Sequence, residues 1–482
     1  MDRSSLVRRA VKRGLAPRVL LVLAVLAATL PLPCQADDST PRPPNVIVIL
    51  VDDLGAFDLG CQGSGFYATP HIDRLAAAGI RFTAGYAACT VCSPTRAALM
   101  TGQAPARLHL TDWIAGHENP QAQLKIPDWQ KHLPLEAVTV AERLSEAGYA
   151  TASIGKWHLG GADHGPEQQG FDTNIAGTDR GQPPSYFSPY TIPTLTDGPA
   201  GEYLTDRLTG EAVTFIEANR DHPFFLYLPH FGVHTPLQAK PDVEAKYVAA
   251  GGLPDAASRA GKPIGGEKAF GQTNATYAAM VASVDDSVGR ILDTLDRLAL
   301  RDSTAIFLTS DNGGLLPITD NRPFRAGKGS AWEGGVRVPF IVSWPGLTPP
   351  GTTSDEPVIT MDIPATILEL SSVGSEPGAP LDGVSLAPVF RGESLDRHAL
   401  HWHYPHYHPG GATPHAAIRA ADWRLVHFYE DGHDELYNLR DDPGEQSDRS
   451  AAEPARAAGM RRELEAWLEE VGAQFPTANP GR

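Results

Sequence analysis

Four runs of consecutive apolar residues constrain the fold more than any other feature of this sequence. The first, NVIVILVDDLG, covers residues 45–55 and is rich in β-branched side chains. Similar runs lie at residues 223–231, 304–314 and 338–346. Strands that are apolar on both faces are typical of parallel sheets, and the amphipathic helical pattern at residues 278–300 is one of those that separate the runs. The sequence therefore predicts an α/β domain with a large, mostly parallel central sheet.

The pattern changes after about residue 395. Short strand patterns joined by polar turns follow, and a helical pattern near the end reads ARAAGMRRELEAWLEEVG. This arrangement is typical of a small α+β unit with an antiparallel sheet. We therefore predict a catalytic domain over residues 44–395 and a C-terminal subdomain over residues 396–482.

The first 36 residues have the layout of a cleavable export signal. Positively charged side chains precede an apolar run over residues 19–30, and small residues follow near Ala36. The run is too short to cross a bilayer comfortably, so we expect a periplasmic or secreted protein without stable membrane insertion. The pair Arg8-Arg9 leaves the twin-arginine export route open beside the general secretory route.

The net charge excludes a protein that binds nucleic acid through bulk attraction. Residues 1–36 carry six positive side chains and Asp2, so cleavage would take the formal charge from −17 to −22. Such an acidic chain is not attracted to nucleic acid or anionic membranes. A local cluster of positive side chains must hold any anionic ligand.

Only three cysteines remain after cleavage: Cys61, Cys89 and Cys92. Three cysteines are too few for a disulfide scaffold, and an odd number leaves at least one unpaired or chemically altered. A disulfide between Cys61 and Cys89 stays open.

The segment CSPTRAALMTG predicts a short helix that begins beside Cys92. Ser93 is a favourable N-cap, Pro94 suits the first helical position, and Gly102 can end the helix. A thiol at a helix N-terminus would be acidified and reactive, and Arg96, one turn on, can point back to it. The alternative is a structural cysteine beside a helix cap.

Two polar pairs directly follow apolar strand runs. Asp52 and Asp53 end the first run, and Asp311 and Asn312 end the third. Ligands gather at the carboxyl ends of parallel strands, and oxygen ligands of this kind suit Ca²⁺ or Mg²⁺. The alternative is ordinary turn and cap chemistry.

Four more residues could bind an anion or move a proton. Lys156 and His158 are two positions apart and would project to one side of an extended segment. Lys328 lies in a glycine-rich loop, and His234 precedes Thr235. Each of these could also be an ordinary core or loop residue.

In combination these motifs resemble type I, formylglycine-dependent sulfatases of the alkaline phosphatase superfamily, in particular arylsulfatases and N-acetylgalactosamine sulfatases. Residues 92–96 followed by Thr101-Gly102 look like the first signature of that family, and GYATASIGKWHLG at 148–160 looks like the second. Four further motifs follow the family's order: VDD, HTP, SDNGG and GKGSAWEGGVRVP. The match covers roughly residues 44–450, and Thr90 departs from the small residue that is usual two positions before the cysteine.

The resemblance implies an alkaline-phosphatase-like sandwich with a small C-terminal subdomain. It also implies that a formylglycine-generating enzyme, or its anaerobic counterpart, oxidises Cys92 to formylglycine, whose hydrate attacks sulfur to give a covalent sulfate hemiester. The implied ligands of one Ca²⁺ per chain are Asp52, Asp53, Asp311, Asn312 and the modified Cys92.

The resemblance assigns the remaining residues to the sulfate and its protons. Arg96 would stabilise the hydrate, and Lys156, His234 and Lys328 would bind the sulfate oxygens. His234 or Lys328 would protonate the leaving alcohol. His158 would take the proton from the remaining hydroxyl and so release sulfate.

Three segments rich in aromatic and polar residues could surround the substrate: residues 107–117, 177–187 and 401–411. Aromatic faces and polar forks suit a sugar ring. We expect an enzyme that acts on chain ends of sulfated polysaccharides or glycosaminoglycans, on galactose or N-acetylgalactosamine sulfates. The histidines at 401, 403, 406 and 408 fit a pocket rim, with a metal site as the alternative.

Two other functions remain open at this point. A formylglycine-dependent phosphodiesterase or phosphonate monoester hydrolase would share the nucleophile and the metal. A non-catalytic protein that binds sulfated glycans would leave Cys92 unmodified.

Overall fold

The computed structural model describes residues 42–255, 271–374 and 380–480. Residues 43–482 form one unit and residues 1–42 another, and the export signal predicted over residues 1–36 lies outside the described residues. Within the described ranges, no helix combines the length and the apolar character needed to cross a membrane.

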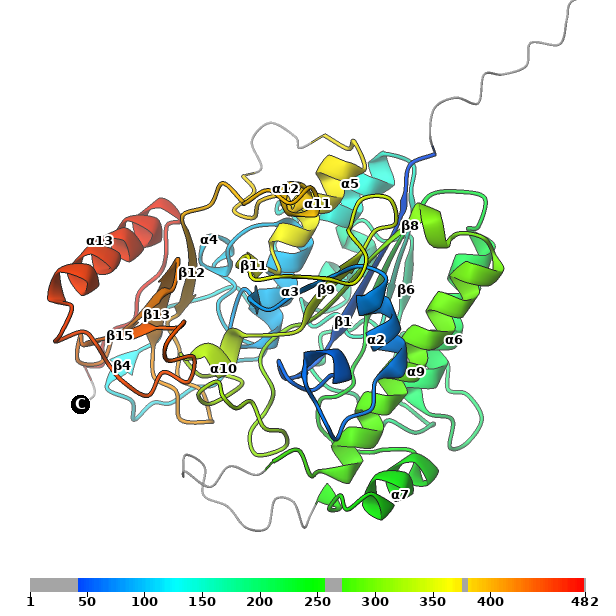
Figure 1. Ribbon diagram of the computed structural model, residues 1–482, viewed down its shortest axis with the longest axis horizontal. Coiled ribbons are helices and arrows are strands. Elements are labelled where there is room, and N and C mark those ends of the chain that lie inside the picture. The colour runs from blue at the N-terminus through cyan, green and yellow to red at the C-terminus, as the bar shows by residue number, and fades with distance from the viewer. Residues whose placement is uncertain (1–41, 256–270, 375–379, 481–482) are drawn as a thin grey trace, which may run out of the picture. The chain divides into compact units, whose positions relative to one another are not determined.

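A mixed sheet forms the centre of the larger unit (Figure 1). Among the described residues it has eight strands, in the order β10 (Thr352–Ser354), β2 (Ile80–Phe82), β9 (Phe340–Ser343), β8 (Thr304–Ser310), β1 (Asn45–Val51), β7 (Phe224–Pro229), β5 (Ala150–Ile154) and β6 (Thr173–Ile175). The strands from β8 to β6 all pair in parallel, which confirms the predicted mostly parallel sheet.

Strand β9 runs antiparallel to both of its neighbours, β8 and β2. It lies within the fourth apolar run, whose composition alone is typical of a parallel strand. The chain leaves β8 at its carboxyl end and returns from that end through the short helix α10 (Glu333–Val336). Without a crossover helix along the sheet, the returning strand has to run in the opposite direction.

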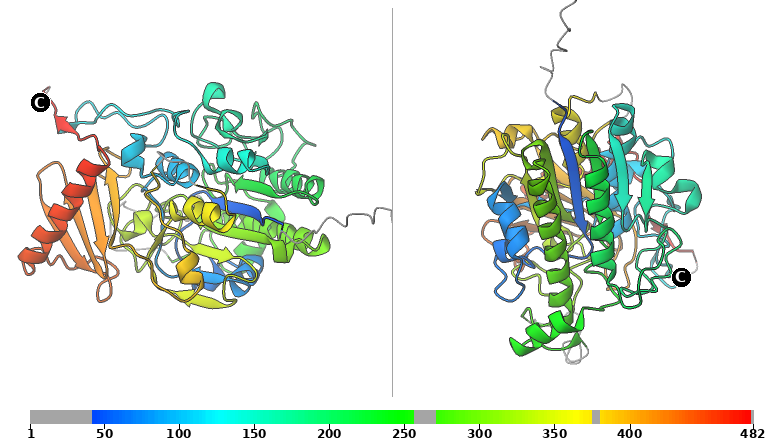
Figure 2. Two further views of the ribbon diagram at one scale, coloured as in Figure 1. Left: turned by 90° about the horizontal axis from the view of Figure 1, so that it is seen from above. Right: turned by 90° about the vertical axis from the view of Figure 1, so that its right-hand side faces the viewer.

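Helices cover both faces of the sheet (Figure 2). Alternate residues of β1 enter two separate cores. Ile47 and Ile49 pack in the core that lies under α6 (Leu204–Ala218) and α9 (Ala275–Arg297). Val46 and Val48 pack in the core on the other face, under α3 (Cys92–Thr101), α5 (Val140–Glu146) and α11 (Asp362–Leu370). Each fully buried side chain of this size contributes about 1.5–3 kcal/mol. The apolar run of β1 therefore reflects burial on both sides.

The C-terminal residues form a second, antiparallel sheet of β12 (Ala399–Tyr404), β13 (His415–Ala420), β14 (Trp423–Phe428) and β15 (Asp434–Asn438). Helix α13 (Pro454–Glu470) covers one face, where Leu464 packs against Ile418. On the other face Trp402 packs against Tyr86 of the main body. The predicted α/β fold with a small antiparallel C-terminal sheet is confirmed, and the boundary at residues 395 and 396 stays a prediction.

Short elements connect these layers. They are η1 (Gly60–Gln62), α2 (Pro70–Ala77), β3 (Gly85–Tyr86), α4 (Pro105–Leu108), β4 (Leu124–Lys125), η2 (Ala162–His164), η3 (Pro166–Gln169), α7 (Pro241–Ala249), η4 (Arg301–Ser303), β11 (Val358–Ile359), α12 (Ala387–Phe390) and β16 (Thr477–Ala478).

Candidate active site

The parallel strands bring their polar turns together at one edge of the sheet. β1, β5, β7 and β8 run in the same direction, so the turns that follow them share the carboxyl-end edge. The structure brings together all the residues predicted as catalytic or metal-binding: Asp52 and Asp53 after β1, Lys156 and His158 after β5, His234 after β7, Asp311 and Asn312 after β8, Cys92 and Arg96 on α3, and Lys328 in the loop before α10.

Arg96 is fully buried and links α3 to two strand ends. Its Nε and Nη2 donate to Oδ2 of Asp311 at 3.0 and 2.7 Å, and its Nη1 donates to the carbonyl oxygen of Lys156 at 3.0 Å. Burial alone would raise the pKa of Asp311, but the guanidinium holds this pKa far below its usual range. The pair therefore stays ionised inside the protein and holds α3 against β8.

Each aspartate after β1 pairs with a different lysine. Nζ of Lys156 donates to Oδ2 of Asp52, and Nζ of Lys328 donates to Oδ1 of Asp53, both at 2.6 Å. Burial and the neighbouring Asp311 raise the pKa of Asp52 to about 7. At Asp53 burial also acts to raise the pKa, but Lys328 outweighs it and the pKa is lowered. Positive and negative groups thus alternate in a largely buried site.

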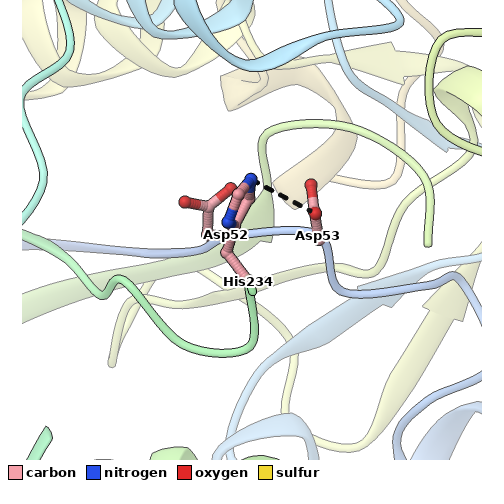
Figure 3. Close-up of side chains that lie close together, drawn as sticks. All are labelled: Asp52, Asp53 and His234. Carbon is pink, nitrogen blue, oxygen red and sulfur yellow. Dashed lines mark ion pairs between the residues drawn. The ribbon is translucent and has the colours of Figure 1, made fainter. Parts of the chain in front are cut away.

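Three oxygens in this cluster are buried and lack a hydrogen-bond partner among the described residues: Oδ1 of Asp52, Oδ2 of Asp53 and Oδ1 of Asn312. Figure 3 shows the two aspartates beside His234, whose Nε2 lies 3.7 Å from Oδ2 of Asp53. One ligand atom each from Asp52, Asp53 and His234 lies within 4.8 Å of the other two. A buried oxygen without a partner is costly, and carboxylate and amide oxygens suit a hard divalent cation. The donor set therefore fits the cation predicted from the sequence.

Helix α3 begins differently from the prediction. Its N-cap is Val91, so Cys92 and Ser93 are already helical, and Ser93 does not cap it. Gly102 follows the last helical residue in the left-handed conformation, as predicted. Cys92 is only 3% exposed, and this burial raises the pKa of its thiol even though Lys156 and Lys328 act to lower it. The predicted acidified thiol is therefore wrong, because loss of water outweighs the nearby positive charge.

His158 lies beside the cysteine and is held from its other side. Its Nδ1 is 3.4 Å from Sγ of Cys92, and its Nε2 is hydrogen-bonded to the carbonyl oxygen of Ile114. The backbone N–H of Ile114 in turn donates to Oγ of Ser93 at 3.1 Å. Gly181 packs on the ring, because a Cβ at this position would lie 2.6 Å from Cε1 of His158. A carbonyl oxygen has no side-chain signature, so the sequence analysis missed the contact of Ile114.

His234 contacts its own loop as well as the acidic cluster. Its Nδ1 bonds to the carbonyl oxygen of Thr235 at 2.7 Å, which leaves Nε2 facing Asp53. Burial and Lys328 lower the pKa of His234 to about 3. At Lys328 burial alone would lower the pKa, but Asp53 outweighs it and raises the pKa. Of Lys328 and His234, Lys328 is therefore the one that is charged near pH 7.

The four histidines of the segment 401–411 separate in the structure. His401 stacks on Trp467, and His403 bonds to Tyr429 and to the carbonyl oxygen of Gln474. His406 bonds to Thr111. His408 instead lies against Gly329, next to Lys328. Within the described part of the chain these histidines do not form a metal-binding group.

All three cysteines outside the export signal are free in the structure. Burial and Asp73 raise the pKa of Cys61 to about 12, and burial raises that of Cys89 to about 12. The disulfide between them that the sequence left open is therefore not formed, and Cys92 alone of the three lies in the cluster.

Comparison with known proteins gives matches over most of the chain. Residues 44–373 match the family model described as Sulfatase, and residues 327–474 match N-sulphoglucosamine sulphohydrolase, C-terminal. Steryl-sulfatase of Mus musculus is 32% identical over 86% of this chain and 76% of its own length. N-acetylgalactosamine-6-sulfatase of Homo sapiens is 34% identical over 74% of this chain and 68% of its own.

A solved structure of similar sequence has the same fold. The crystal structure of Ps i-CgsB in complex with k-i-k-neocarrahexaose superposes with a TM-score of 0.72 at 32% identity, covering 89% of this chain and 93% of that one.

Proposed function

This chain belongs to the sulfatase family and is a sulfuric ester hydrolase, and we propose that it removes sulfate from a carbohydrate by means of a formylglycine made from Cys92. The observation that carries the proposal is the position of Cys92. Its Sγ lies 3.4 Å from His158, and its side chain shares one buried cluster with Lys156 and Lys328. A nucleophile, a base and two cations are the groups that sulfate transfer needs.

The hydrated aldehyde at position 92 would supply the attacking hydroxyl. Lys156 and Lys328 would bind the sulfate oxygens, since both ammonium groups lie in the cluster around Cys92. His158 is placed to accept a proton, because its Nε2 is occupied by Ile114 and its Nδ1 faces position 92. Arg96 would hold the modified side chain in place from one turn along α3.

The leaving alcohol needs a proton as the sulfate ester breaks. His234 and Lys328 both lie beside Asp53, on the cluster's less buried side. Without substrate Lys328 is charged and His234 is neutral near pH 7, because Asp53 raises the pKa of Lys328 and the pKa of His234 is lowered to about 3. We propose that His234 or Lys328 supplies this proton, and that Lys328 also binds a sulfate oxygen.

A calcium ion would neutralise charge that develops on the sulfate oxygens. Asp52, Asp53, Asp311 and Asn312 would hold it together with the modified Cys92. The argument for these ligands is the set of buried oxygens without partners on Asp52, Asp53 and Asn312.

Three loops that reach the cluster support a carbohydrate substrate. The loop 107–117 reaches His158 through Ile114, the loop 177–187 through Gly181, and the loop 401–411 reaches Gly329 through His408. These loops carry aromatic and polar side chains that suit a sugar ring. Because the relatives include an N-acetylgalactosamine-6-sulfatase, we propose a galactose or N-acetylgalactosamine sulfate at a chain end as the substrate.

The proposal includes the route to the active enzyme. The chain would be exported through the signal in residues 1–36 to the periplasm or the medium, and a maturation enzyme would oxidise Cys92 before folding. The burial of Cys92 to 3% exposure supports this order, because a folded chain would not offer the thiol to another enzyme.

Ion chromatography of released sulfate and phosphate tests this function. The panel holds galactose and N-acetylgalactosamine monosulfates, 4-nitrophenyl sulfate and a phosphodiester. Matured wild type should release sulfate from at least one sugar, and Cys92→Ala should release none. Cys89→Ser is the matched control, because this buried cysteine three residues away lies outside the cluster and the variant should keep its activity.

Other results would change the assignment. Phosphate release in place of sulfate would move the protein to the phosphodiesterases and phosphonate monoester hydrolases. Peptide mass spectrometry that finds only thiol at Cys92 in protein from the native host would favour a glycan-binding role.

A further inference from the structure

The C-terminal sheet sends one side chain into the neighbourhood of the sulfate-binding lysine. The loop that follows β12 turns back at residue 408, where the N–H of His408 donates to the carbonyl of Ala412 and the N–H of Gly411 donates to the carbonyl of His408. This turn places the ring of His408 on the backbone of Gly329. A Cβ at residue 329 would lie 2.3 Å from Nδ1 of His408, so a side chain here would displace the ring.

Gly329 joins this ring to the active site. It follows Lys328 directly, has a φ of 78°, and donates its N–H to the carbonyl oxygen of Thr90 at 2.8 Å. A left-handed backbone without a Cβ is therefore required for the loop to pass between Thr90 and His408. The ring of His408 therefore packs on the residue that directly follows Lys328.

The hydrogen bonds of His408 define what it can offer a ligand. Its Nδ1 accepts the N–H of Gly410 at 3.0 Å, so the proton of the neutral ring is on Nε2. The side chain is half-buried, and Nε2 has no hydrogen-bond partner among the described residues. Burial and then Lys328 lower the pKa of His408 to about 4, so the ring is neutral near pH 7. A neutral N–H donor suits a hydroxyl better than a second sulfate.

We propose that His408 is a specificity-determining residue that donates a hydrogen bond from Nε2 to a hydroxyl of the sugar, next to the carbon that carries the sulfate. The proposal rests on the proposed function and extends it to a named contact. The other histidines of the segment are committed elsewhere: His401 to Trp467, His403 to Tyr429 and His406 to Thr111.

Steady-state kinetics of matured His408→Ala, His408→Gln and wild type test the proposal. One substrate is the best galactose or N-acetylgalactosamine monosulfate of the panel, and the second is its deoxy analogue without the hydroxyl beside the sulfated carbon. The third is 4-nitrophenyl sulfate, which has no sugar hydroxyl. His401→Ala is the control, because His401 lies in the same segment but packs on Trp467.

We expect His408→Ala to lower kcat/KM for the sugar about tenfold or more, as loss of one buried hydrogen bond predicts. The value for 4-nitrophenyl sulfate should stay the same. For the deoxy analogue the substitution should have no further effect, since the partner hydroxyl is already missing. His408→Gln should recover part of the activity through its side-chain N–H, and His401→Ala should match wild type on every substrate.

Equal losses on the sugar and the aryl ester would overturn the proposal, because they would show a general effect on the site. An equal loss on the deoxy analogue would also overturn it. A wild type that cleaves the aryl ester but no galactose or N-acetylgalactosamine sulfate would overturn it while leaving the sulfatase chemistry intact. Release of no sulfate from any panel member would remove the proposed function itself.

Discussion

The carbonyl oxygen of Ile114 accepts a hydrogen bond from Nε2 of His158, and this contact decides which ring nitrogen faces Cys92. With the proton on Nε2, the neutral ring presents Nδ1 as an acceptor. The N–H of Ile114 donates to Oγ of Ser93, the residue after Cys92. Ile114 therefore links His158 to Ser93, the residue that follows Cys92 on α3.

Ser93→Ala should lower kcat about tenfold and leave KM within about twofold, because the base is displaced while the sulfate-binding lysines stay in place. Steady-state kinetics on the sugar sulfate measures both constants. Peptide mass spectrometry must first show that Cys92 is converted equally in both proteins. Ser93→Thr keeps a hydroxyl and should recover most of the activity. If Ser93→Thr were as slow as Ser93→Ala, the hydrogen bond to Ile114 would not be the cause.

Removal of the proposed calcium ion should destabilise the folded protein. The partner-free oxygens on Asp52, Asp53 and Asn312 would lose the charge that compensates their burial. At a calcium concentration one hundred times Kd, the expected stabilisation is about 2.7 kcal/mol. Differential scanning calorimetry with a chelator and with added Ca²⁺ measures it.

The calcium effect should depend on the predicted ligands. Asp53→Asn should abolish the dependence of Tm on calcium. Asp285→Asn is the matched control, because Asp285 belongs to a second group of possible ligands, with His71 and Asp286. The carboxylate of Asp285 accepts hydrogen bonds from the backbone N–H groups at the start of α2. An Asp285→Asn protein that lost the calcium response would place the ion at this second group.

Arg96→Lys should destabilise the unmodified, thiol form of the protein by about 3–5 kcal/mol, since a lysine cannot keep the contacts to both Asp311 and Lys156. Denaturant unfolding followed by fluorescence measures the change. Arg107→Lys is the matched control, because the Arg107–Asp382 pair is partly exposed and should contribute about 0–1 kcal/mol. Equal effects of the two substitutions would contradict a structural role for the buried pair.

Asp58 should make stability depend on pH. It is fully buried, and burial raises its pKa from 3.8 to about 6 despite hydrogen bonds from Tyr277, Thr319 and other donors. The folded state therefore binds this proton more tightly than the unfolded state. The resulting stabilisation is complete below about pH 4 and is lost as the pH rises through 6, and a shift of this size corresponds to about 3 kcal/mol.

Asp58→Asn removes the titrating group, so the stability difference between the variant and wild type should move in favour of the variant between pH 4 and pH 7. Denaturant unfolding at several pH values measures this difference. The exposed Asp221, replaced by Asn, serves as the control and should give a flat difference. A flat difference for Asp58→Asn as well would mean that its carboxylate is ionised in the fold throughout this range.

Local patterns in the sequence were enough to predict the central sheet and the polar residues at the ends of its strands. An apolar run such as residues 45–51 is long enough to report burial on both faces, and the polar residues that follow parallel strands must share an edge. The motifs around Cys92 and Lys156 were assigned to the same site by their resemblance to the two sulfatase signatures. The roles given to these residues remain proposals.

Other features depended on contacts between distant segments. β9 has the composition of a parallel strand, and only its short return from β8 makes it antiparallel. The four histidines after residue 400 look equivalent in the sequence, and packing alone directs His408 toward Gly329 and His401 toward Trp467. The thiol of Cys92 lies at the start of a helix, yet burial raises its pKa.

The sequence by itself therefore determined the class of fold and the polar residues that follow the strands, and its resemblance to the sulfatases determined the set of side chains available for sulfate chemistry. The first two properties follow from the periodicity and the order of residues, which are local. Only the tertiary structure decided the direction of β9, the orientation of His158 by the carbonyl of Ile114, and the solvation of Cys92. Pairing direction, backbone hydrogen bonds and burial depend on which distant segments meet, and no local pattern specifies that.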